Sequence, residues 1–203
     1  FASITTAAEP ASPNTPLVSL SAEKNGAERF LGLERLMMTL IVRYGEQAID
    51  GEGEDGEPIQ TTLIEYVYDD LAYDGITLRS PLYAQMLHLA HAHIHDSDFV
   101  ASKFLLNNQE ESISREAADL ISERYQLSKG NQMTQSEEQL KVAYISRLLL
   151  DYKNAIVEEE LKQCNADLTR PEVKNDITKT LEIMQRMKEL SEIQRKIARY
   201  LGD

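Results

Sequence analysis

The fold is decided by SEEQLKVAYISRLLLDYKNAIVEEELKQC, residues 136–164, and by ITKTLEIMQRMKELSEIQRKIARYL, residues 177–201. In the first stretch Ser136 and Gln139 form a capping box, and apolar residues then recur every three or four positions, which predicts one long helix. In the second stretch apolar residues recur about every 3.4 positions, close to the spacing of a coiled-coil seam. We expect a turn of about five residues after Cys164, so the two helices pack as an antiparallel hairpin.

Upstream of the long helix, capping signals predict a bundle of shorter helices. Asn25 with Glu28 opens a helix that ends near Tyr44, and Thr62 with Glu65 caps a second helix that ends at Gly75. Ser80 followed by Pro81 starts a third helix, which runs to about residue 95. Shorter helices are expected over 98–106 and over 112–125. The Gly-rich and acidic stretch 50–58 is expected to be a solvated loop, and no strand pattern of useful length appears outside 76–78.

These patterns predict an all-α fold, in which a helical bundle is followed by a long helix and a C-terminal antiparallel hairpin. Residues 1–20 contain Pro10, Pro13 and Pro16 without helical periodicity and are expected to form a flexible linker. The bundle is assigned to residues 21–150 and the hairpin to residues 151–203.

The charge of the chain argues against nucleic-acid binding. The net charge is −13, of which residues 1–150 carry −12 and residues 151–203 carry −1. Because nonspecific affinity for nucleic acid comes from Lys and Arg side chains that displace counterions, we expect no direct binding to DNA or RNA.

The remaining composition favours a cytoplasmic protein. Cys164 is the single cysteine and has no partner for an internal disulfide, which favours a reducing compartment. No stretch reaches the roughly 18 to 20 uninterrupted apolar residues of a membrane span. The chain begins at Phe1 rather than Met, so we expect it to be part of a longer protein, and we expect a monomer.

A histidine cluster is the one candidate for metal chemistry. His88, His91 and His95 would share one helix face, an arrangement that can ligate Zn²⁺ or Ni²⁺. No remote ligand accompanies them, and histidines near a helix C-terminus more often interact with the helix dipole. We therefore predict no metal here, with His88, His91 and His95 as the alternative ligand set.

No motif in the sequence predicts catalysis or a cofactor. Asp96 and Asp98 superficially match a Mg²⁺-binding acidic pair, but they follow a predicted helix and more often cap the next one. The sequence contains no Gly-rich phosphate loop, nucleophile elbow or paired cysteines, and the acidic stretch 50–57 lacks the spacing of a Ca²⁺ loop. We predict that this chain is not itself an enzyme.

The predicted surface of the last helix points to protein binding. The expected seam residues can cover only one face of a two-helix hairpin; they are Ile177, Leu181, Met184, Leu190 and Ile197. The apolar surface that remains should find a partner, with adaptable Met contacts and a charged rim. The predicted partner-binding residues are Met184, Met187, Lys188, Glu192, Arg195, Lys196, Arg199, Tyr200 and Leu201. The alternative is that these basic residues complement the helix C-terminus and the Met side chains fill the seam.

Several segments resemble the C-terminal, helicase-binding region of bacterial replicative primases, the DnaG family. The resemblance rests on ERLMMTLIVRYGE at 34–46 and, within 80–129, on SPLYAQML, FLLNN and ISREAADLISERYQLSK. The long helix and terminal hairpin match the layout of that family, so the resemblance covers roughly residues 25–203. It implies a bundle and hairpin that dock onto the amino-terminal domains of the hexameric replicative helicase, stimulate it and recruit the polymerase. The zinc-binding domain and the magnesium-dependent polymerase domain of that family lie earlier in the chain and have no counterpart in this sequence.

Three other classes of protein remain as alternatives. The amino-terminal domain of the helicase itself is similar in fold to the primase bundle, but a nucleotide-binding domain would follow it, whereas this chain ends on its hairpin. A di-iron helical bundle would need paired Glu-x-x-His motifs, and none of the histidines has a Glu three residues before it. A generic helical regulatory adaptor is the third alternative, and it would not capture a hexameric ATPase.

Overall fold

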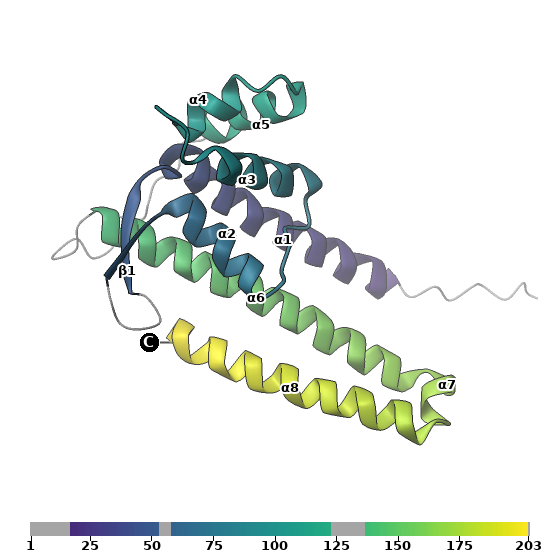
Figure 1. Ribbon diagram of the computed structural model, residues 1–203. Coiled ribbons are helices and arrows are strands. Elements are labelled where there is room, and N and C mark those ends of the chain that lie inside the picture. Colours follow the sequence, from purple (N-terminus) through teal and green to yellow (C-terminus); the bar gives the residue numbers. More distant parts are fainter. Residues whose placement is uncertain (1–16, 53–57, 123–136, 203) are drawn as a thin grey trace, which may run out of the picture.

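The computed structural model confirms the all-α class (Figure 1). It describes residues 17–52, 58–122 and 137–202, in which eight helices accompany one pair of short strands. The elements in chain order are α1 Leu17–Tyr44, β1 Ala48–Glu52, β2 Pro58–Thr62, α2 Leu63–Tyr73, α3 Pro81–His93, α4 Ala101–Leu106, α5 Glu111–Ser122, α6 Glu137–Thr169, α7 Pro171–Lys174 and α8 Ile177–Gly202.

Two of the predicted helix starts are confirmed at the level of individual hydrogen bonds. The Thr62 hydroxyl accepts from the Glu65 N–H, and the Glu65 carboxylate accepts from the Thr62 N–H at 2.8 Å, which completes the capping box of α2. The Ser80 hydroxyl accepts from the N–H of Tyr83, and Pro81 occupies the first turn of α3. Local sequence therefore fixes where both helices begin.

The start of α1 differs from the prediction. The helix begins at Leu17 and continues through Asn25 and Glu28, so these residues do not cap it, and 17–20 belong to the helix rather than to a linker. Residues 1–16 lie outside the described residues, as do the predicted cap Ser136 and the last residues of the helix predicted over 112–125.

A pair of strands includes both ends of the stretch 50–58, which was predicted to be a loop. Strands β1 and β2 pair antiparallel, with Ala48 opposite Thr62 and Glu52 opposite Pro58, while 53–57 lie outside the described residues. The strands are rich in Gly, Asp, Glu and Pro and lack a clear alternation of apolar residues, so the sequence pattern did not identify them. Ile49 is buried and joins the main core. Residues 76–78 form no strand.

The connection between α3 and α4 also differs from the prediction. Helix α3 ends at His93, and the residue that precedes α4 as its N-cap is Val100, which makes no side-chain capping bond. Asp98 instead adopts a left-handed conformation with φ of 59°, and the Asp96 carboxylate is hydrogen-bonded to Nδ1 of His93 within the turn. The acidic pair therefore shapes the turn, and the expected N-capping of α4 by Asp96 or Asp98 is wrong.

Helix α6 is longer than predicted and passes straight through Cys164. Side chains support the helix beyond that point, because the Asn165 amide donates to the Leu161 carbonyl and Gln163 donates to Asp167. The helix ends where Pro171 follows, since proline restricts the preceding residue, and Arg170 is accordingly extended. The turn between the long helices spans 170–176 and contains the single-turn helix α7.

The main hydrophobic core surrounds α1 and includes the first half of α6 (Figure 1). On α6 it extends from Ile145 to Tyr152 and Ala155, both of which are buried. The same helix then continues away from the bundle and pairs with α8. Thus one helix is shared between the bundle and the hairpin, and the core crosses residue 150.

A buried carboxylate joins the bundle to α6. Glu34 is 1% exposed and accepts hydrogen bonds from the Arg79 N–H at 2.5 Å, the Ser80 N–H at 3.0 Å and the Tyr152 hydroxyl at 2.6 Å. Burial and the hydrogen bond to Glu34 hold the pKa of Tyr152 well above its ordinary value, so the hydroxyl remains a donor. The Arg79 guanidinium covers the ring of Phe30 and pairs with Glu159 further along α6.

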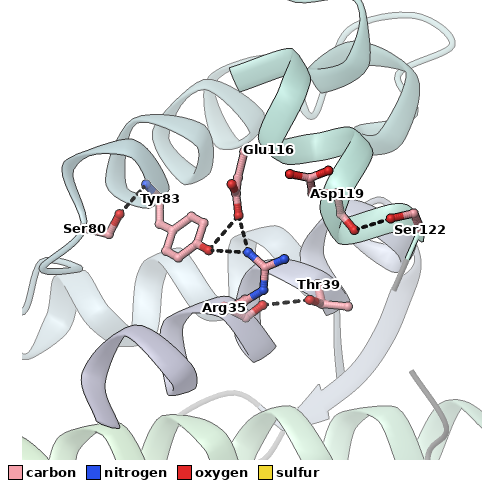
Figure 2. A network of polar contacts seen from close by, with 7 residues as sticks. All are labelled: Arg35, Thr39, Ser80, Tyr83, Glu116, Asp119 and Ser122. Carbon is pink, nitrogen blue, oxygen red and sulfur yellow. Dashed lines mark hydrogen bonds and ion pairs between the residues drawn. The ribbon is translucent and has the colours of Figure 1, made fainter. Parts of the chain in front are cut away.

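A second polar network ties three helices of the bundle together (Figure 2). The Arg35 guanidinium of α1 lies between the Tyr83 hydroxyl of α3 and the Glu116 carboxylate of α5, at 3.2 and 2.5 Å. The Tyr83 hydroxyl also donates to Glu116 at 2.8 Å. Burial, then this hydrogen bond, raises the pKa of Tyr83 to about 12. The bundle that carries the long helix is thus braced by nonlocal polar contacts as well as by apolar packing.

Candidate partner-binding surface

The residues of α8 that face α6 recur at alternating spacings of three and four. Leu190 and Ile197 are buried and contact Val157, and the partly buried residues continue the same row at Thr180, Ile183, Met187, Gln194 and Leu201. Arg186 pairs with Glu160 at 2.6 Å, while Tyr200 and Leu150 line the same pocket. This order shows that α8 runs antiparallel to α6, and the hairpin geometry is that of a short coiled-coil seam.

Three of the predicted seam residues lie outside the seam. Ile177, Leu181 and Met184 are 79%, 60% and 54% exposed, so the prediction that they pack against the partner helix is wrong. Successive residues of a helix are rotated by about 100°. We call the residues that face α6, from Thr180 to Leu201, the Thr180 row. Leu181 and Met184 each follow a member of the Thr180 row by one position, so they point to its side. The apolar residues of α8 therefore do not form one row: α6 covers the Thr180 row, Ile177, Leu181 and Met184 form an exposed row, and Ile193, 42% exposed, belongs to neither.

The exposed row continues along the helix as a row of charged residues. Spacings of four and three connect Ile177, Leu181 and Met184 to Lys188, Glu192, Arg195 and Arg199, all of them exposed. We call these seven residues the α8 stripe. Five of them are among the predicted partner-binding residues, whereas Ile177 and Leu181 were assigned to the seam.

The other predicted partner-binding residues lie beside the α8 stripe or on the seam. Lys196 and Tyr200 are exposed on the flank, where Tyr200 is 75% exposed. Met187 is half-buried on the seam side, and Leu201 packs against the cluster formed by Val157, Leu190 and Ile197. These two side chains contribute mainly to the hairpin itself.

The cations of the α8 stripe have no carboxylate partner in the described parts of the chain. Lys179 and Arg186 elsewhere on α8 pair with Asp176 and Glu160. No such ion pair involves Lys188, Arg195 or Arg199 within the ranges that the structure covers. Their charges are therefore available to a binding partner.

Tyr200 also lines a small pocket of about 190 Å³ where the end of α8 approaches the bundle. Its other walls come from α2 and α6, among them Tyr66, Asp70 and Lys153. The Lys153 ammonium lies 2.7 Å from Asp70 and 2.6 Å from Asp74. Burial alone would lower the pKa of Lys153, but hydrogen bonds to these two carboxylates raise it above its ordinary value, so the lysine stays charged. The junction between hairpin and bundle is thus held by a half-buried ionic cluster.

The candidate metal ligands do not converge on one point. His91 stacks on the Tyr68 ring with 3.7 Å between centroids, and His95 lies 3.2 Å from Glu65, whereas His88 is exposed. His93, which was not among the predicted ligands, lies 2.6 Å from Asp96 and packs against Phe104. Among the described residues no group of three His, Cys, Asp or Glu side chains is placed to hold a metal ion.

Cys164 is half-buried against the hairpin cluster. In the described ranges none of the helices combines the length and the hydrophobicity that a membrane span requires.

The sequence pattern assigned Ile177 and Leu181 to the seam rather than to the exposed surface. The average spacing of about 3.4 for all apolar residues of α8 does not distinguish a covered row from an exposed one. A signal that separates the rows is the strict alternation of three and four from Thr180 to Leu201, which excludes Ile177, Leu181, Met184 and Ile193 from the covered row.

Comparison with known proteins places the chain in a family. No protein of curated function and no solved structure matches it. One family model, described as a domain of unknown function (DUF8430), matches residues 21–203, which include every element from β1 onward and most of α1. The chain therefore belongs to the family described as domain of unknown function DUF8430.

Proposed function

We propose that this chain is the non-catalytic interaction region of a DNA primase, and that it docks onto the amino-terminal domains of a hexameric replicative helicase. The observation that carries the proposal is the α8 stripe, because Ile177, Leu181 and Met184 expose a row of large apolar side chains on a helix that packs mainly against α6 and α7. Contiguous exposed apolar surface of this kind is typical of a protein-binding site.

The identity of the partner rests on the sequence resemblance to bacterial replicative primases. The segments that carry it, 34–46 and 80–129, build α1 and α3 to α5, which support α6 and hence the hairpin. In this proposal the bundle and α6 hold α8 in place, docking stimulates the helicase, and the polymerase module is brought to unwound DNA in the cytoplasm. Primer synthesis belongs to other domains of the primase.

The proposal is tested by titrating purified residues 1–203 into the amino-terminal domain of the replicative helicase from the same organism. We expect saturable binding by calorimetry with Kd of about 10 μM or tighter. Leu181→Ser should weaken binding at least tenfold, because it removes the centre of the apolar row. Leu106→Ser is the matched control, since Leu106 is an exposed leucine on α4 of the bundle, 39% exposed, and its substitution should leave Kd unchanged.

Two outcomes would overturn the proposal. Absence of binding at about 100 μM of both proteins would remove the helicase as the partner and leave a generic adaptor. Assembly of the chain itself into a ring, seen by light scattering, would favour the amino-terminal domain of a helicase instead.

A further inference from the structure

The α8 stripe is divided along its length into an apolar part and a basic part. The apolar residues Ile177, Leu181 and Met184 occupy the end next to the hairpin turn, while Lys188, Arg195 and Arg199 occupy the end next to the C-terminus, with Glu192 among them. Helix α8 contains six Lys or Arg residues and three Glu residues, although the net charge of the whole chain is −13. The helix is therefore a basic element in an acidic protein.

This division disfavours a second copy of the chain as the occupant. If two α8 helices paired in parallel, the basic ends would meet and Arg195 would oppose its own counterpart. If they paired antiparallel, the basic end of each helix would cover the apolar residues of the other and desolvate charges without a counterion. In neither arrangement are the α8 stripes of two copies complementary, so the surface that binds the α8 stripe belongs to a different protein.

Polyanions and membranes match only part of the α8 stripe. Phosphates would neutralise Lys188, Arg195 and Arg199 but would leave the apolar residues in contact with water, and the acidic remainder of the chain would repel them. A lipid surface would accept the apolar residues, but only three of them are present, in about two helical turns. A protein helix can match both parts at once.

We infer that the α8 stripe receives one amphipathic helix of the partner, which presents apolar side chains toward the hairpin turn and Asp or Glu side chains toward the C-terminal end of α8. From Ile177 to Arg199 the α8 stripe extends about 33 Å, so the partner helix has about six turns. The inference rests on the proposed function in that this helix would belong to the helicase, and it adds the chemistry and the polarity of the contact.

The test uses charge exchange between α8 and a synthetic helix. The probe is a stapled peptide of about six turns with Leu at core spacing in one half and Glu on the same face in the other half. We expect it to bind residues 1–203, and we expect binding to weaken at least tenfold when its Glu residues are replaced by Lys. The triple variant Lys188→Glu, Arg195→Glu, Arg199→Glu should reverse that preference. Raising the salt concentration from about 0.05 to 0.5 M should weaken binding only where the charges are opposite, that is, for the wild type with the Glu peptide and for the triple variant with the Lys peptide.

A control variant separates the α8 stripe from general charge. Lys103→Glu, Arg115→Glu, Lys162→Glu makes the same change in net charge at exposed positions away from the α8 stripe and should keep the wild-type preference. Because Glu near a helix C-terminus weakens the helix, the neutral variant Lys188→Gln, Arg195→Gln, Arg199→Gln is measured too and should lose the preference without reversing it.

The outcomes distinguish the inference from the proposed function. Equal binding of the Glu and Lys peptides, or an equal effect of the control variant, would overturn the inference even if the helicase domain binds. Tighter binding of a random single-stranded oligonucleotide or of anionic phosphatidylserine vesicles to the α8 stripe would also overturn it. The predicted preference together with no binding to the helicase domain would uphold the inference and refute only the proposed function.

Discussion

Removal of the Glu34 carboxylate should destabilise the protein about as much as truncation of a large buried apolar side chain. In Glu34→Ala the N–H groups of Arg79 and Ser80 and the hydroxyl of Tyr152 lose their acceptor in a site where Glu34 is 1% exposed. Each buried donor left without a partner costs about 1 to 3 kcal/mol. Tyr152 can recover part of this, because the Thr77 carbonyl lies 3.5 Å from its hydroxyl. We expect the free energy of unfolding to fall by about 3 to 5 kcal/mol.

Two further variants at the same site make the estimate specific. Glu34→Gln keeps one oxygen for Arg79 and Tyr152, but its NH₂ group faces the Ser80 N–H, so it should cost about 1 to 2 kcal/mol. Tyr152→Phe removes one donor and should cost about 1 kcal/mol. The double variant Glu34→Ala, Tyr152→Phe should be less harmful than the sum, because the phenol no longer needs an acceptor.

The assay is urea unfolding monitored by circular dichroism. The free energy of unfolding in water and its slope against urea concentration are compared among the variants. A cost below about 1 kcal/mol for Glu34→Ala would refute the reasoning, because it would mean that water replaces the carboxylate without loss. An additive double variant would likewise show that Glu34 and Tyr152 do not interact in solution.

Thr62→Ala should lower the unfolding free energy by about 1 kcal/mol through loss of the capping box, in the same urea assay. Gly45→Ala should cost about 1 to 3 kcal/mol, because a methyl group there would lie 2.6 Å from the Ile64 side chain; an unchanged transition midpoint would contradict this. Since the pKa of Tyr83 is raised from 10.0 to about 12, its contribution to stability is present below pH 10 and is lost as the pH rises toward 12. Stability measured across that range should therefore fall less steeply in Tyr83→Phe than in the wild type. A chain that ends at 165 should remain folded, whereas one that ends at 151 lacks Tyr152 and should melt at a lower temperature by calorimetry.

The sequence predicted best what depends on neighbouring residues. The starts of α2 and α3 were identified because a capping box and a Ser-Pro pair act within three or four positions of each other. The β-hairpin was missed because its pairing is stabilised by the residues around it rather than by an alternating pattern of its own.

The orientation of α8 shows why part of the candidate surface could not be predicted. Leu181 and Leu190 both belong to rows with helical spacing, and only the position of α6 decides that Leu190 is buried and Leu181 exposed. The Arg35 and Glu116 contact joins residues 81 positions apart, which no local pattern encodes. The charged half of the α8 stripe, in contrast, was identified from the sequence because Lys and Arg side chains on a terminal helix are exposed in most folds.

The sharing of α6 between two cores has a mechanical consequence. The helix has 33 residues and is about 50 Å long, and its first half is clamped in the bundle. Among the described residues, the ion pairs of Glu158 with Arg29 and of Glu159 with Arg79 are where α6 leaves the bundle, and the helix beyond them is a stiff arm. From Glu159 to Thr169 the arm measures about 15 Å, so a rotation of about 10° at its base would move the hairpin turn by about 3 Å. Force applied to α8 by a moving partner would therefore be concentrated on these two ion pairs at the edge of the bundle.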